Sequence, residues 1–174
     1  HRVGDAGVAV LTSGMPRRSL QEELQQSKPF ETPADEAVVA LMRTAALVRR
    51  AMARRVETFG ISVPQYNVLR ILRGAGPDGL PTLAVRDRLI EEAPGITRLI
   101  DKLEEAGLVS RKRASDRRVV PCVITAKGLR LLAEMDPVLH EVSAELTKGL
   151  ADPTQQRQLI ALLGDLRAGL DEAR

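Results

Sequence analysis

The spacing of apolar residues changes abruptly in the middle of this 174-residue chain, and that change constrains the fold most. In 96–103 Ile and Leu recur at intervals of three and four, which predicts one buried face of an α-helix. In 108–113 and 119–125 the composition is β-rich, and a short polar turn at 114–118 separates the two runs. This pattern predicts a hairpin directly after the helix. Because Pro121 lacks an N–H donor, the second strand is expected to be an edge strand or locally irregular.

Two shorter helices are expected before this helix and hairpin. Ser62 and Gln65 are spaced as a capping box, which predicts a helix start and a helix over 63–73. Thr82 is expected to cap a further helix over 82–90, and Pro94 to open the next one, which ends at Gly107. A helix, a short turn and a helix of this size predict a helix-turn-helix.

Long amphipathic helices are expected on both sides of this unit, over 33–59, 126–150 and 153–171. Thr32 and Asp35 form a capping-box pattern at the first of these helices. The expected division is a flexible arm over 1–31, a dimerisation helix over 32–59, a DNA-binding domain over 60–125 and dimerisation helices over 126–174. The predicted fold class is mainly α with a small β-hairpin wing, a winged helix-turn-helix with long dimerisation helices.

Composition narrows the functional classes. Apolar residues make up 44% of the chain and aromatic residues 2%, so a core of aliphatic side chains is expected. No apolar run approaches the roughly 20 residues that a membrane-spanning helix needs, which favours a cytoplasmic protein without a membrane partner. Catalytic residues, metal ligands and cofactors are not expected, because the sequence has no triad order, no ligand cluster and no phosphate loop, and His140 is the one histidine away from residue 1.

Charge is distributed unevenly along the chain. Nine Lys and Arg residues and four acidic residues lie in 94–130, whereas 131–174 carries four basic and eight acidic residues. A basic block followed by an acidic helical tail is typical of a protein in which one part meets a polyanion. A solvated surface is the alternative interpretation of the same charges.

The order of motifs in this chain resembles the multiple antibiotic resistance regulator (MarR) family of bacterial transcription factors. The resemblance is carried by the helix Pro-Gly-Ile-Thr-Arg-Leu-Ile-Asp-Lys-Leu-Glu-Glu-Ala-Gly-Leu-Val at 94–109, Ser-Asp-Arg-Arg-Val at 115–119 and Thr-Ala-Lys-Gly at 125–128. It implies a recognition helix, a wing with an Asp-x-Arg tip and the start of a dimerisation helix. It also implies double-stranded DNA as the partner, and a homodimer that acts on a pseudo-palindromic operator as a regulator, by expectation a repressor.

Candidate DNA-reading residues lie on the exposed face of the first motif. Arg98 is expected to donate two hydrogen bonds to guanine, and Thr97 to contact a thymine methyl group or a phosphate. Gly95 permits close approach of the helix N-terminus to a phosphate, and Lys102 lies on the same outward face. The alternative role for Arg98 is an ion pair with Asp101, three residues along the helix.

The predicted wing supplies the second set of candidates. By resemblance, Arg118 enters or borders the minor groove, and Asp116 orients it or a neighbouring basic group. Arg111, Arg113 and Arg117 are expected to neutralise phosphates, with a solvated hairpin as the alternative.

Relatives in this family bind small, often phenolic or anionic, effectors between the head and the dimer helices. By resemblance, Arg43, Tyr66 and His140 are the candidate effector contacts, with packing or surface roles as the alternative. Cys122 is expected to be either a buried inert thiol or a redox switch.

One feature departs from the family pattern and one rival function remains. Glu91 and Glu92 place two acids close to where DNA is expected to run. The rival is a winged-helix module that binds proteins without reading DNA, although such a module does not need an outward Arg98 together with an arginine-rich wing.

Overall fold

The computed structural model describes residues 18–92, 95–112, 120–150 and 152–172. The chain divides into two compact units, 1–46 and 47–174, and each is taken separately below. Within the described ranges the structure is mainly helical with one small antiparallel sheet, as the sequence predicts.

The first unit contains a short helix that the sequence pattern did not predict. Helix α1 (Leu20–Glu23) begins with a capping box, in which Ser19 and Glu22 accept each other's backbone N–H. The signal was present as Ser-x-x-Glu, but no apolar run follows it. The described end of 1–31 therefore contains one helical turn. The flexibility predicted for the arm stays a prediction, and residues 1–17 lie outside the described part of the chain.

Helix α2 (Pro33–Val56) begins in this unit and ends in the second. Its predicted start is confirmed, because the Thr32 hydroxyl accepts the N–H of Asp35 at 3.1 Å and the Asp35 carboxylate accepts the N–H of Thr32 at 3.2 Å. The 3-10 turn η1 (Glu57–Phe59) follows, and Gly60 ends it in the left-handed region at φ 77°. Glycine adopts this conformation without the steric cost that other residues incur.

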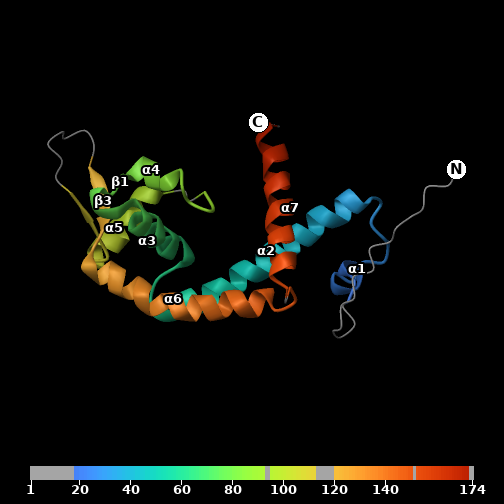
Figure 1. Cartoon of the computed structure of the whole chain (residues 1–174). Helices are drawn as coiled ribbons and strands as arrows, with labels where there is room; N and C mark the ends of the chain where they lie inside the picture. Colours follow the sequence, from blue (N-terminus) through green and yellow to red (C-terminus); the bar gives the residue numbers. More distant parts are fainter. Residues whose placement is uncertain (1–17, 93–94, 113–119, 151, 173–174) are drawn as a thin grey trace. The chain divides into compact units, whose positions relative to one another are not determined.

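The second unit carries the winged head (Figure 1). Its elements in chain order are α3 (Val63–Ala75), η2 (Gly76–Asp78), β1 (Leu80–Pro81), α4 (Thr82–Arg86), α5 (Ile96–Glu105), β2 (Val109–Arg111), β3 (Pro121–Ile124), α6 (Ala126–Thr147) and α7 (Pro153–Glu172). The Ser62–Gln65 capping box predicted at the start of α3 is present.

Helix α4 is shorter than predicted and is capped differently. It ends at Arg86, and Thr82 is its first helical residue, not its cap, because Pro81 holds the N-cap position. Pro81 belongs to β1, so strand pairing fixes the backbone at that point. The Thr82 hydroxyl instead lies 3.8 Å from the sulfur of Cys122.

The sheet corrects the prediction for Pro121. The strand order is β1-β3-β2, so β3 is the central strand and not an edge. Pro121 is the first residue of β3 and lies opposite Pro81, at the end of the ladder with β1. Its missing N–H therefore interrupts no inner hydrogen bond, while its carbonyl accepts the N–H of Lys112 at 2.9 Å. The sequence pattern missed the two-residue strand β1.

The core of this unit lies among α3, α5, the sheet and the first half of α6, which Figure 1 shows together at the N-terminal end of α6. Aliphatic side chains fill it, in keeping with the low aromatic content, and it includes Leu69, Leu72, Ile100, Leu103, Leu132 and Met135, all fully buried. Because α6 supplies core residues, the long helix begins as part of the head.

Candidate nucleic-acid interface

Helix α5 presents a polar face outward from the head. Ile96, Ile100 and Leu103 are buried and face the core, as the three-and-four spacing predicts. Thr97, Arg98 and Lys102 are exposed on the opposite side. The helix thus combines an anchored apolar face with a free polar one, which is the arrangement a groove-reading helix requires.

Helix α5 begins at a glycine. Gly95 is its N-cap residue with φ 85°, and a Cβ atom built there would meet no atom of the described residues within 4 Å. This backbone conformation favours glycine, and the N–H groups of the first helical turn have no partner inside the helix, so they can bind an anion. Pro94, the predicted helix opener, lies outside the described residues.

The ion-pair alternative for Arg98 is not what the structure contains. Asp101 pairs with Arg111 of β2, and among the described residues no carboxylate lies within salt-bridge distance of Arg98 or Lys102. Arg98 and Lys102 therefore carry positive charge that a phosphate or a base edge can meet.

Arg111 has different surroundings from those expected of a phosphate contact. Its guanidinium binds the carboxylates of Asp101 and Glu104, and its backbone N–H donates to Glu104 Oε1 at 3.1 Å. The hydrogen bond to Asp101, followed by that to Glu104, raises the pKa of Arg111 above its usual value. The sequence missed this cluster because its members come from a helix and a strand.

The end of α5 is held by the start of α6. Gly107 turns the chain at φ 71°, and the N–H of Leu108 donates to the carbonyl of Leu103 at 2.9 Å. The Thr125 hydroxyl donates to the carbonyl of Gly107 at 2.7 Å, and Lys127 Nζ donates to that of Ala106 at 2.8 Å. Carbonyls that have no partner inside the helix are thereby satisfied.

Close packing explains why glycine occupies the last position of the Thr-Ala-Lys-Gly motif. A Cβ atom there would lie 2.4 Å from the carbonyl oxygen of Leu108 and 2.7 Å from Ile124 Cγ1. The absence of a side chain therefore allows α6 to approach the strand that leaves the candidate recognition helix. The sequence pattern identified this motif but did not indicate the close packing at Gly128.

The acidic segment before α5 is partly neutralised inside its own unit. Arg49 Nη1 lies 3.1 Å from Glu91 Oε1, and the N–H of Ile90 donates to Asn67 Oδ1 at 3.0 Å. The loop is thus tied to α2 and to α3 just before the candidate recognition helix. Both partners of the ion pair are about 60% exposed, so its contribution to stability is small.

The predicted wing tip lies outside the described residues, and with it Arg113, Asp116, Arg117 and Arg118. The base of the hairpin is described, with Val109 opposite Ile124 and Arg111 opposite Cys122. Cys122 itself is fully buried.

The three candidate effector contacts belong to different units, and each is described within its own unit. Arg43 belongs to the first unit, where its Nε is buried and has no acceptor among the described residues. Tyr66 is 7% exposed, and the guanidinium of Arg70 lies 5.8 Å from the centre of its ring. His140 is exposed on α6.

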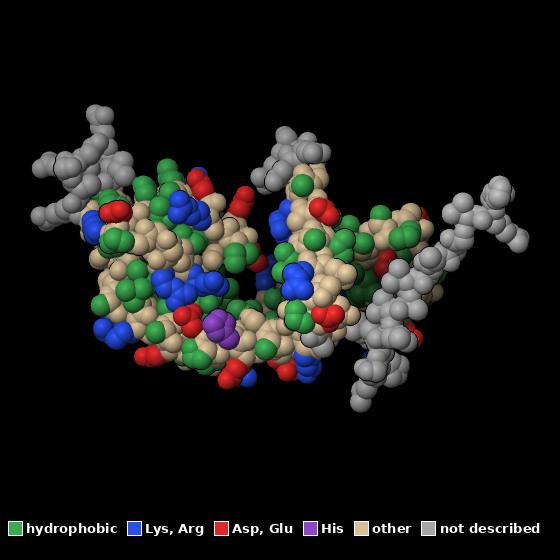
Figure 2. Space-filling model, in the orientation of Figure 1, with side chains coloured by type: hydrophobic (Ala, Val, Ile, Leu, Met, Phe, Trp, Pro, Cys, Tyr) green, Lys and Arg blue, Asp and Glu red, His purple; other side chains and the backbone are tan. Residues whose placement is uncertain are grey.

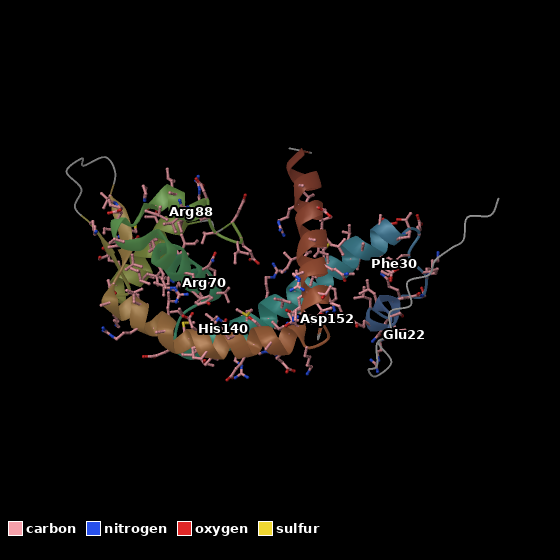
Figure 3. All side chains as sticks on the ribbon, in the orientation of Figure 1. Glu22, Phe30, Arg70, Arg88, His140 and Asp152 are labelled. Carbon is pink, nitrogen blue, oxygen red and sulfur yellow. The ribbon has the colours of Figure 1, made fainter. Side chains whose placement is uncertain are left out.

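A cluster of charged side chains lies where α3 meets α6, next to Tyr66. Arg73 forms two hydrogen bonds with Asp136, at 2.7 and 3.3 Å, and the bond lowers the pKa of that carboxyl group, with smaller effects from His140 and Arg70. Figure 2 shows basic side chains over α3 beside the purple His140, and Figure 3 labels Arg70 and His140 there. The sequence did not single out Arg70, Arg73 or Asp136.

No helix among the described residues is long and apolar enough to cross a membrane. Within the same part of the chain, no group of His, Cys, Asp or Glu side chains could hold a metal ion.

Comparison with known proteins agrees with this architecture. The model of the MarR family matches residues 61–120. A crystal structure of a MarR transcription factor from Planctomyces limnophilus is 36% identical, with 78% of this chain and 98% of that chain covered and a TM-score of 0.61.

Two solved relatives contain DNA. The Staphylococcus protein MepR ("S. aureus MepR-DNA complex") is 21% identical over 76% of this chain and 96% of its own, with a TM-score of 0.67. A mutant MarR from E. coli complexed with operator DNA is 22% identical over 73% of this chain and 90% of its own, with a TM-score of 0.66. At these identities the two structures show a shared fold. The identity and coverage of the Planctomyces protein show more: this chain belongs to the MarR family of transcription regulators.

Proposed function

We propose that this regulator binds double-stranded DNA sequence-specifically, with α5 in the major groove and the hairpin beside it. The observation that carries the proposal is the outward face of α5, where Thr97, Arg98 and Lys102 are exposed and no described carboxylate neutralises the two cations. Relatives with the same fold have been solved with DNA, which supports the same use here.

In this proposal the residues have separate tasks. Arg98 reads a base edge through two hydrogen bonds, since a guanidinium matches guanine O6 and N7, and Thr97 contacts a thymine methyl group or a phosphate. Lys102 and the N–H groups after Gly95 hold phosphates and set the register. Arg113, Asp116, Arg117 and Arg118 remain the proposed wing contacts.

We further propose that the active species is a homodimer. Large apolar side chains are exposed on helices α2 and α7. They include Val38 and Met42 on α2 and Ile160, Leu162 and Leu170 on α7. Burial of such a side chain contributes about 1.5–3 kcal/mol, so a second copy that covers these faces would be strongly favoured. A two-fold dimer would place two α5 helices on a pseudo-palindromic operator.

An open groove in the second unit supports the same assembly. It has a volume of about 740 Å³ and lies between the end of α2 and the middle of α6. Ala51, Val138 and Val142 contribute apolar lining, while Arg55 and Glu141 contribute opposite charges. An apolar floor with charges of both signs suits a helix from a second copy of the chain.

Regulation by a small aromatic or anionic molecule is the finer part of the proposal. Arg70 offers positive charge beside the Tyr66 ring, and His140 lies on α6 near Asp136, where the head meets α6. A ligand bound there would alter DNA affinity only if it favoured one arrangement of the head over another. Repression, with release by such an effector, and action in the cytoplasm complete the proposed function.

Selection of genomic DNA fragments by the pure protein, followed by sequencing, tests the proposal. The expected result is one enriched pseudo-palindrome with half-sites about one helical turn apart, about 34–36 Å. Sedimentation should show a dimer at micromolar concentration. Fragments recovered at random, or a stable monomer, would contradict the sequence-specific or the dimeric part respectively, and recovery of no DNA would favour a protein-binding module.

A further inference from the structure

Arg111 joins the strand that leads into the hairpin to the flank of α5. Its Nη1 donates to Glu104 and its Nη2 to Asp101, while its backbone N–H donates to the second oxygen of Glu104 at 3.1 Å. Asp101 and Glu104 are one helical turn apart, so both carboxylates face the same strand. Glu104 thus accepts from the main chain and the side chain of one residue.

The strength of this contact follows from its geometry and its burial. Hydrogen bonds between a guanidinium and carboxylates are charge-assisted, and the planar fork of arginine fixes direction as well as distance. The Arg111 side chain is 28% exposed, compared with 60% for Arg49 in its ion pair with Glu91. Water therefore screens the Arg111 contact less than the Arg49–Glu91 pair.

The same contact determines what the neighbouring charges can do. Arg111 with Asp101 and Glu104 has a net charge of −1, so Arg111 is already neutralised. Asp101 forms its ion pair with Arg111 and not with Arg98. Arg98 therefore has no carboxylate partner among the described residues.

We propose that Arg111 is a positioning residue for DNA recognition, one that fixes the hairpin relative to α5 and keeps Arg98 available, and that it does not act as a phosphate contact. Arg111 lies opposite Cys122 in the sheet, so the clamp joins α5 to the described base of the hairpin. This role rests on the proposed DNA-binding function, because it concerns how the two DNA-contacting elements are arranged.

Replacement of an acid by its amide separates this role from simple electrostatics. Glu104→Gln removes a negative charge near DNA, so electrostatics alone predicts tighter binding. Loss of the clamp predicts weaker binding, by about threefold to tenfold, as expected when one charge-assisted hydrogen bond becomes a neutral one. Glu105→Gln is the matched control, because Glu105 is the exposed neighbour on α5 whose side chain has no hydrogen bond or ion pair to another described residue.

The salt dependence of binding supplies the second readout. The slope of log K against log salt is negative, and each phosphate contact that is lost reduces its magnitude by about 0.9. Arg111→Ala should weaken binding while leaving this slope within about 0.3 of the native value, and Lys102→Ala should reduce its magnitude by about 0.9 per subunit. Arg111→Lys keeps the charge but not the fork, so it should resemble Arg111→Ala in affinity.

The measurement is fluorescence anisotropy on a selected operator, with circular dichroism and thermal melting to confirm folding. The inference is overturned if Glu104→Gln tightens binding as Glu105→Gln does, or if Arg111→Ala reduces the magnitude of the slope by about 0.9 per subunit. If Arg111→Ala does not fold, the Glu104→Gln and Glu105→Gln pair still decides. Failure of the native protein to bind any DNA would contradict the proposed function itself, whereas equal affinities of native protein and Glu104→Gln would contradict only the positioning role.

Discussion

The hydroxyl of Thr125 donates a 2.7 Å hydrogen bond to the carbonyl of Gly107, and the same oxygen accepts the N–H of Gly128 at 3.1 Å. One side chain therefore caps the start of α6 and holds the turn at the end of α5. With Lys127 bonded to Ala106, the candidate recognition helix and the long helix share a junction in which each satisfies backbone groups of the other. A movement of α6 would thereby reach α5 directly.

Removal of the Thr125 hydroxyl should destabilise the protein. Thr125→Val keeps the shape but loses the cap and the bond to Gly107, each worth about 1 kcal/mol, so the free energy of unfolding should fall by about 2 kcal/mol. Thr125→Ser keeps both bonds and should change stability by less than about 0.5 kcal/mol. Urea unfolding measures the difference, and equal stabilities of the two variants would show that the junction does not depend on the hydroxyl.

A pair of glycine substitutions tests the close approach at Gly128. Gly128→Ala places a methyl group 2.4 Å from the carbonyl oxygen of Leu108, so it should cost about 1–3 kcal/mol through overpacking. Gly74, in α3, has nothing within 4 Å of the same added atom, and Gly74→Ala should stabilise the helix by about 0.5–1 kcal/mol. Thermal melting should shift in opposite directions for the two variants. A shared direction would contradict the packing described at Gly128.

The pair of Arg73 and Asp136 should make stability depend on acid pH. The folded pKa of Asp136 lies below its usual value, chiefly because of the hydrogen bond from Arg73. The unfolded chain therefore binds more protons between the two values, so this stabilisation is present above about pH 4 and is lost as the pH falls through the folded pKa. Both side chains are about a third exposed, so the expected contribution is no more than about 1 kcal/mol.

Urea unfolding from about pH 6 to about pH 3, a range that includes the usual pKa of aspartate, measures this effect. Arg73→Met and Asp136→Asn should each flatten the curve below about pH 4. An unchanged curve in Arg73→Met would show that other groups near Asp136, such as His140 and Arg70, control its protonation.

The thiol of Cys122 should be inert in the folded protein. It is fully buried in the central strand, and its described polar neighbour is the hydroxyl of Thr82 at 3.8 Å. A thiol-specific reagent should therefore react only as fast as the head unfolds, because the reaction needs an accessible thiolate. Urea should accelerate the labelling strongly. Rapid stoichiometric labelling of native protein would instead favour a redox role.

Local signals in the sequence were sufficient for much of the fold. The capping residues Thr32 and Ser62 and the apolar stripe of α5 were predicted correctly, because the partners are three or four residues apart. The prediction of Thr82 as a cap and the edge-strand alternative for Pro121 were wrong for one reason, since both depend on pairing between β1 and β3, which are about 40 residues apart in the chain.

The candidate site was predicted only as far as its local part. The outward positions of Thr97, Arg98 and Lys102 follow from helical periodicity. The partners of Arg111 do not, because a strand residue and two helix residues meet only after the turn at Gly107 is formed. Arg73 and Asp136 are 63 residues apart in the chain, so a local sequence pattern could not predict their contact either.

Base-resolved affinity measurements show whether α5 reads base pairs through Arg98. Affinities of the native protein, Arg98→Ala and Lys102→Ala are to be measured for the selected operator and for every single-base variant of one half-site, at several salt concentrations. Arg98→Ala should lose about 1–3 kcal/mol of discrimination at one base pair of each half-site and keep its discrimination elsewhere. Lys102→Ala should weaken all sequences equally. If Arg98→Ala retains the full native base preferences, α5 does not read base pairs through this residue.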